Sequence, residues 1–175
     1  MASSYSAAAA PRSALLGLAL TFALLLICVA AQSTWPTWLR LHGQVPDLTL
    51  AAVISLGLTT GSLSGLTAGF VGGFLWGSVA GLPLGNLFVS HMGLGFLAGA
   101  MRGRMFSDRL LLAVIVVAAG VMVAAVVNLV LAPPPSPQQW VSAVLARAVF
   151  SGLLTVPIYA LTRFLSRYYP EPEGL

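Results

Sequence analysis

The chain has 175 residues, of which 58% are hydrophobic and only 7% are charged, and its mean hydropathy is +0.95. Soluble domains carry roughly a quarter charged residues, so this composition excludes a soluble enzyme and predicts an all-α integral membrane protein whose main solvent is lipid. All eight basic residues are arginines, and no basic run is interleaved with aromatic residues, which argues against nucleic-acid binding.

Six apolar stretches follow one another, and we expect each to form a transmembrane helix. A helix needs on the order of 20 residues to cross a bilayer core. Residues 1–12 are predicted to be a disordered cytoplasmic N-terminus, residues 13–168 a single membrane domain, and residues 169–175 a cytoplasmic tail. The predicted spans are 13–31, 46–60, 62–80, 84–101, 110–131 and 140–165.

The first stretch allows a second interpretation. Arg12, the apolar run 14–27 and Val29-Ala30-Ala31 before Gln32 resemble a signal peptide with its cleavage site. Cleavage would leave five spans and would not change the orientation of the others. We favour a retained helix, because the run is long for the apolar region of a signal peptide and several spans follow.

The second and third stretches are separated almost only by Gly61, which predicts a tight helical hairpin. The arginines support this division, because short cytoplasmic loops are enriched in basic residues. With six spans and the N-terminus inside, Arg40 alone falls in an outer loop. The cytoplasmic side then holds Arg12, the basic loop of Arg102, Arg104 and Arg109, and Arg163 and Arg167. The sequence therefore predicts that both ends of the chain are cytoplasmic.

Glycine recurs at every fourth position from Gly61 to Gly85, mainly on the third span. Small residues at this spacing let another helix approach closely. The pattern predicts a helix-packing face, and the sequence leaves open whether the neighbour belongs to the same bundle or to a partner protein. The interface residues that we predict are Gly65, Gly69, Gly73, Gly77 and Gly81.

Arg147 lies on the last span and shares a helix face with Ser151, Thr155 and Tyr159, because the four recur at fourfold spacing. An arginine inside a bilayer costs about 2.5–3.5 kcal/mol unless it pairs or reaches the headgroups. Asp47 begins the second span on the same outer side, so we predict a buried Asp47–Arg147 pair. The alternative is that the guanidinium extends to the outer headgroups.

No catalytic or metal-binding pattern is evident. His91 lies in mid-span without a second histidine or a carboxylate at helical spacing, which argues against a metal ligand. Paired carboxylates, a nucleophile elbow and a zinc-protease motif do not occur. We therefore expect no catalytic residues, no cofactor and no enzymatic activity.

The segment 46–106 resembles the MreD family of rod shape-determining membrane proteins. Gly77 and Leu87 depart from the family pattern, which often has an acidic residue and a histidine at these two positions. The motifs that carry the resemblance are Pro46-Asp47-Leu48, Gly65-Leu66-Thr67-Ala68-Gly69-Phe70, Gly81-Leu82-Pro83-Leu84-Gly85, Gly95-Phe96-Leu97-Ala98-Gly99, Arg102-Gly103-Arg104 and Phe106.

The resemblance implies a multi-pass protein of the bacterial cytoplasmic membrane that serves as a scaffold of the cell-elongation complex. It implies direct binding to the bitopic protein MreC, which links cytoplasmic MreB filaments to the peptidoglycan synthase RodA and a class B penicillin-binding protein. It also implies a fold similar to the substrate-binding subunits of energy-coupling-factor transporters.

The alternative function is therefore a vitamin-binding subunit of such a transporter. That function requires an outer pocket, to which Trp35, Trp38, His42 and Gln44 would contribute.

Overall fold

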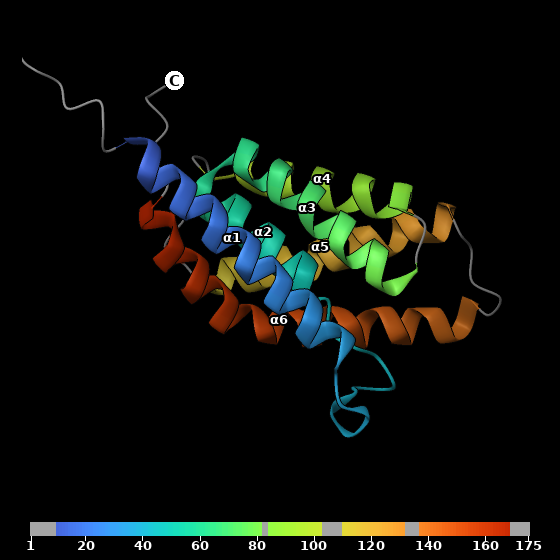
Figure 1. Ribbon diagram of the computed structural model, residues 1–175. Helices are drawn as coiled ribbons and strands as arrows, with labels where there is room; N and C mark the ends of the chain where they lie inside the picture. Colours follow the sequence, from blue (N-terminus) through green and yellow to red (C-terminus); the bar gives the residue numbers. More distant parts are fainter. Residues whose placement is uncertain (1–9, 82–83, 103–109, 132–136, 169–175) are drawn as a thin grey trace, which may run out of the picture.

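The computed structural model of the protein describes residues 10–81, 84–102, 110–131 and 137–168. These residues form six α helices, two short 3-10 turns and no strand, which confirms the predicted all-helical fold (Figure 1). The helices are α1 (Ala10–Ser33), α2 (Leu48–Thr60), α3 (Ser62–Ala80), α4 (Leu84–Ala100), α5 (Leu110–Leu131) and α6 (Pro137–Leu165), and the turns are η1 (Thr37–Leu39) and η2 (Ser166–Tyr168).

Four of the helices, α1, α3, α5 and α6, are long and apolar enough to cross a membrane. By contrast, α2 has 13 residues and α4 has 17. At ~1.5 Å per residue, α2 is only about 20 Å long, shorter than a ~30 Å bilayer core. Where the sequence predicted six spans, the structure therefore has four helices of spanning length and two shorter ones.

Some helix ends differ from their predicted positions. Helix α1 begins at Ala10, so residues 10–12 belong to a helix and not to the predicted disordered N-terminus, whereas residues 1–9 and 169–175 lie outside the described part of the chain. Pro11 and Pro137 are tolerated because a proline in the first turn of a helix removes no intrahelical hydrogen bond. Helix α2 begins two residues later than predicted, because Asp47 is its N-cap.

Helix α2 lies in the middle of the bundle and contacts all five other helices (Figure 1). Every residue from Leu48 to Leu58 is buried. On one side, Leu50 and Ile54 belong to a cluster with residues of α5 and α6, such as Val117 and Ala148. On the other side, Val53 and Leu56 pack with residues of α1 and α3. A helix that is apolar on all faces is thus buried on all faces.

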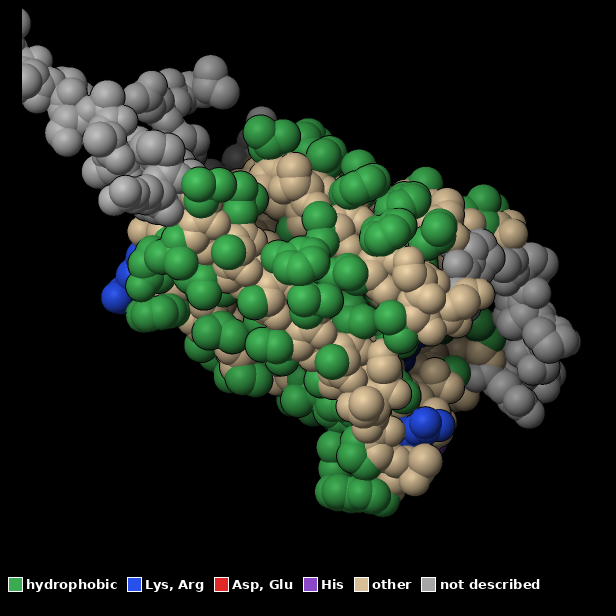
Figure 2. Space-filling view, viewed as in Figure 1, with side chains coloured by type: hydrophobic (Ala, Val, Ile, Leu, Met, Phe, Trp, Pro, Cys, Tyr) green, Lys and Arg blue, Asp and Glu red, His purple; other side chains and the backbone are tan. Residues whose placement is uncertain are grey.

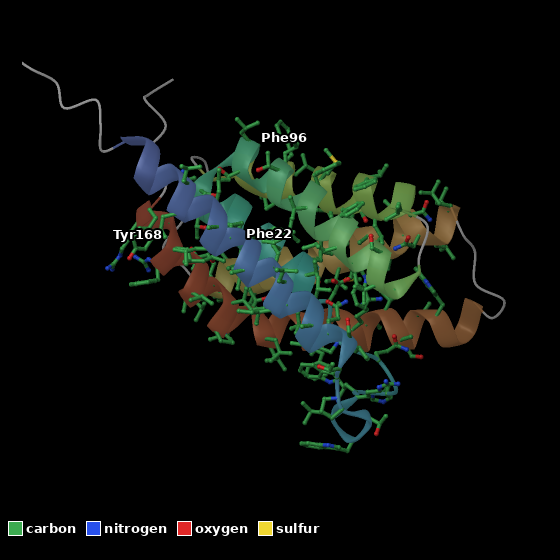
Figure 3. All side chains as sticks on the ribbon, in the orientation of Figure 1. Phe22, Phe96 and Tyr168 are labelled. Atoms are coloured by element: carbon green, nitrogen blue, oxygen red, sulfur yellow. The ribbon has the colours of Figure 1, made fainter. Side chains whose placement is uncertain are left out.

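The outer surface of the bundle is apolar as well. Hydrophobic side chains cover most of the face seen in Figure 2, and arginine atoms are visible mainly at its two ends. Phe22 of α1 and Phe96 of α4 extend away from the bundle and are 47% and 44% exposed (Figure 3). A bundle that buries one apolar helix and exposes apolar side chains around it is suited to lipid, so the chain is a membrane protein.

The two ends of the bundle differ in their charges. Helix α1 begins, and α6 ends, at the same end, where η2 also contacts α1 (Figure 1). We call this the Arg163 end; Arg102 at the end of α4 and Arg167 of η2 also lie there. The opposite end, which we call the Asp47 end, holds Arg40 and the pair of Asp47 and Arg147.

Candidate functional site

The glycine stripe of α3 packs against α4. A methyl group built on Gly65 would collide with the carbonyl of Gly95, and one on Gly69 would collide with the backbone of His91. At Gly73 the added carbon would lie 3.1 Å from the Leu87 carbonyl oxygen. The predicted interface therefore lies within the bundle along most of its length, because only glycine lets the two backbones come this close.

The last two members of the stripe have different surroundings. A methyl group on Gly77 would meet the side chains of Leu84 and Leu87, which are flexible, and not a backbone. Among the described residues, no atom lies within 4 Å of the position that a Cβ on Gly81 would take. Its φ of 64° is left-handed at the C-cap of α3, so Gly81 ends the helix and does not pack against a neighbour.

A single residue, Gly61, connects α2 to α3. Its φ of 109° is a conformation that residues with a side chain rarely adopt, and its N–H donates to the Gly57 carbonyl at 2.9 Å. Next to this turn, a methyl group on Gly99 of α4 would collide with the backbone of Ser62. Helices α2, α3 and α4 thus meet backbone to backbone at the Arg163 end.

The structure brings Asp47 and Arg147 together: Asp47 Oδ2 accepts from Arg147 Nη2 at 2.8 Å. The Asp47 side chain is 9% exposed and the Arg147 side chain 35%. Asp47 also caps α2, because its Oδ1 accepts from the Leu50 N–H at 3.1 Å, and its own N–H donates to Ser151 Oγ at 2.8 Å. One aspartate thus holds the start of α2 against the middle of α6.

A second polar link, between Gln32 and Thr49, was not predicted. Gln32 Oε1 accepts from both the backbone N–H and the hydroxyl of Thr49, each at 3.1 Å. Both residues are buried, and this N–H belongs to the first turn of α2, where no intrahelical carbonyl is available. The signal in the sequence was an amide side chain at the end of one apolar span and a threonine at the start of the next.

A cavity of about 330 Å³ lies at the Asp47 end, between helices α3, α4, α5 and α6 and the start of α2. Two indole rings line it, from Trp76 at the end of α3 and Trp140 near the start of α6. Its other polar lining residues are Gln44, Asp47, Asn86, Ser90, His91, Asn128 and Arg147. Side chains that are far apart in the sequence, from four helices and the segment before α2, therefore line one partly open space.

Of the four residues predicted to contribute to an outer pocket, only Gln44 lines this cavity. Trp35 instead packs edge-on against Phe150, with ring centroids 5.5 Å apart, and Trp38 is 81% exposed. His42 lies in an exposed turn, with a φ of 50°. Trp38 and His42 are thus exposed, and Trp35 packs against another part of the bundle, an arrangement that sequence spacing does not reveal.

The other candidate residues give no site. Arg102 is half-buried after the last turn of α4, and its N–H donates to the Gly99 carbonyl at 3.2 Å. Arg104 and Arg109 of the predicted basic loop lie outside the described residues. In the part of the chain that the structure describes, no group of three or more histidines, cysteines or carboxylates could hold a metal.

A comparison with protein families matches residues 12–165 to the rod shape-determining protein MreD, from the first turn of α1 to the last residue of α6. No curated protein and no solved structure gave a match. The matched range includes the Asp47–Arg147 pair, the glycine stripe and every helix that lines the cavity. This coverage shows that the chain belongs to the MreD family of rod shape-determining proteins.

Proposed function

We propose that this protein is a membrane scaffold of the bacterial cell-elongation complex, which binds MreC directly and helps to link MreB filaments to RodA and a class B penicillin-binding protein. The family match carries this proposal, because MreD proteins act in rod-shape determination. The architecture supports it: the described residues are almost entirely helical and expose apolar side chains around the bundle, which suits binding to helices of other membrane proteins.

The protein is proposed to lie in the bacterial cytoplasmic membrane as a multi-pass protein, with both ends in the cytoplasm. Arginine placement supports this orientation, because Arg102, Arg163 and Arg167 lie at the Arg163 end. At the Asp47 end, Arg147 is paired with a carboxylate, which leaves Arg40 as the unpaired arginine among those described there. The Asp47 end would then face outward.

Cysteine labelling tests the orientation. The single native cysteine, Cys28, is buried and is first replaced by serine. In that background, Thr37→Cys places a thiol in the exposed η1 turn, and Ser166→Cys places one in η2. We expect a membrane-impermeant maleimide to label Thr37→Cys in intact cells and Ser166→Cys only after permeabilisation. The reverse pattern would show that the proposed orientation is inverted.

Partner binding is proposed to use surfaces other than the glycine stripe. Gly65, Gly69 and Gly73 are already covered by α4, so a partner helix has no access to them. We propose instead that the Asp47–Arg147 pair, with Ser151, fixes α6 against α2, so that the Asp47 end presents one defined shape to MreC. Loss of the pair would then weaken MreC binding through the shape of this end.

Co-purification from native membranes tests the scaffold function. The tagged full-length chain, expressed at its native level, is solubilised in mild detergent, and bound proteins are quantified by mass spectrometry. We expect MreC in near-stoichiometric amount, with RodA and the penicillin-binding protein in smaller amounts. Two variants are compared. Asp47→Asn breaks the pair, and Arg40→Gln, the matched control, removes an exposed charge at the same end. Equal recovery of MreC with both variants would contradict the proposed role of the pair.

A vitamin-binding transporter subunit is the second candidate, and the cavity at the Asp47 end is the observation that favours it. A fold similar to such subunits, which the family resemblance implies, is likewise a proposal. The same purification separates the two functions. Recovery of ATPase subunits together with a vitamin would favour the transporter, and the absence of MreC would then exclude the scaffold.

A further inference from the structure

The connection between α1 and α2, residues 34–46, exposes large apolar side chains. Trp38 is 81% exposed, Leu41 41% and Leu39 39%, and we call these three residues the Trp38 patch. The connection projects from the side of the bundle (Figure 1), and hydrophobic side chains lie at its tip (Figure 2). Large apolar side chains gathered in one short connection mark a surface that contacts lipid or protein.

The connection is held in a fixed shape against α6. The Trp35 ring packs edge-on against Phe150 of α6, with ring centroids 5.5 Å apart, and Trp35 Nε1 donates to the Leu39 carbonyl at 3.2 Å. The Gln44 N–H donates to the Leu41 carbonyl at 2.9 Å. The Trp38 patch therefore keeps its position relative to the bundle, and its level in the membrane follows from the helices around it.

The helices place this connection within the thickness of the bilayer. Helix α2 ends beside Arg102 at the Arg163 end, and its length of about 20 Å leaves Asp47 about 10 Å short of the far boundary of a ~30 Å core. On α6, Val141 and Leu145 lie closer to the Asp47 end than Arg147 does, and they are 52% and 48% exposed. The exposed apolar surface thus continues past the level at which the connection joins α2, so the connection is not raised above the bilayer.

Within the bilayer, the backbone of the connection restricts the Trp38 patch to the interface. Non-helical backbone that faces lipid does not occur in the hydrocarbon core, because its polar groups would be left without partners. At the headgroup boundary those groups can bind water, and tryptophan is enriched there. Arg40, the one charged residue of the connection, is exposed and can extend its guanidinium into the headgroups. Neighbouring side chains of a 3-10 helix point about 120° apart, so Thr37 can face water while Trp38 faces lipid.

We propose that the Trp38 patch is inserted in the phospholipid interface at the Asp47 end, between the headgroups and the acyl chains, and anchors the bundle there. The occupant of the patch is the lipid surface and not a partner protein. Interfacial tryptophan anchors help to set the tilt and rotation of membrane helices. Through Trp35 and Phe150 the anchor holds α6, and through Asp47 it holds the start of α2. This inference goes beyond the scaffold function and does not depend on it, because it concerns only lipid and this chain.

Depth-dependent fluorescence quenching of the purified full-length protein in liposomes tests the anchor. Trp76→Phe and Trp140→Phe leave Trp35 and Trp38 as the only tryptophans, and the same chain with Trp38→Phe is the reference whose signal is subtracted. The quenchers are iodide in the water and phosphatidylcholine with bromine at either the headgroup end or the methyl end of its acyl chains. We expect Trp38 to lose most of its signal to bromine at the headgroup end and least to iodide.

Val149→Trp in the reference chain calibrates the measurement. Val149 is 56% exposed near the middle of α6, where bromine at the methyl end of the acyl chains should quench an indole most. The anchor is refuted if iodide quenches Trp38 most, because the patch would then lie in water and be open to a partner protein. It is also refuted if Trp38 and Val149→Trp give the same quenching profile, because the patch would then lie in the hydrocarbon core. The protein is purified without MreC, and MreC recovery is measured separately, so failure of the anchor leaves the scaffold proposal standing.

Discussion

Removing either partner of the Asp47–Arg147 pair should destabilise the protein, and by different amounts. The Asp47 side chain is 9% exposed and the Arg147 side chain 35%. Arg147→Met leaves a nearly buried carboxylate without its counter-charge. We expect it to lower the free energy of unfolding by about 3 kcal/mol, the lower end of the range for breaking a buried pair. Asp47→Asn leaves an arginine that can extend toward water, so its cost should be only about 1–2 kcal/mol.

Asp47→Ala separates the two roles of this aspartate. Asparagine still accepts from the Leu50 N–H as an N-cap, whereas alanine does not. Loss of a cap costs ~1 kcal/mol, so the alanine variant should be less stable than the asparagine variant by about that amount. The order of stability is therefore predicted to be wild type, Asp47→Asn, Asp47→Ala, Arg147→Met.

The assay is reversible unfolding in mixed micelles as a function of the mole fraction of SDS, followed by tryptophan fluorescence. A double-mutant cycle with Asp47→Asn and Arg147→Met gives the coupling free energy, expected to be about 1–3 kcal/mol because the residues are in direct contact. Arg40→Met, a change in the exposed connection between α1 and α2, is the control and should stay within about 0.5 kcal/mol of the wild type. Additive single variants, or equal losses in Asp47→Asn and Asp47→Ala, would refute this reasoning.

Three further predictions use the same unfolding assay. Gly69→Ala should lower the free energy of unfolding by about 1–3 kcal/mol, because its methyl group meets the backbone of α4. Gly93→Ala, whose methyl group meets no described atom, should be neutral or stabilising by up to ~1 kcal/mol. Equal effects of the two variants would contradict the close packing. Gln32→Ala should cost about 1–3 kcal/mol, because it leaves the N–H of Thr49 unsatisfied, and an unchanged stability would exclude that link. Gly61→Ala should cost about 1–3 kcal/mol through its φ of 109°, and a neutral result would mean that the turn relaxes.

Several features could be derived from the sequence because they depend only on local pattern. The low charge and the six apolar stretches predicted an all-helical membrane protein, and the motifs from Pro46 to Phe106 predicted its family. The proximity of Asp47 and Arg147 could also be anticipated. Asp47 begins one predicted span and Arg147 lies in another on the same side, and an unpaired arginine inside a bilayer is costly enough to favour a partner.

Other features were decided only by the tertiary structure. In a membrane protein, the side chains that face lipid and those that face the core are both apolar, so periodicity does not show which face of a helix is buried. For this reason the sequence could not place α2 at the centre or assign the glycine stripe to α4. The position and lining of the cavity could be predicted from the sequence pattern even less. Trp76, His91, Asn128 and Arg147 come from four helices, and only the packing of the whole bundle brings them around one space.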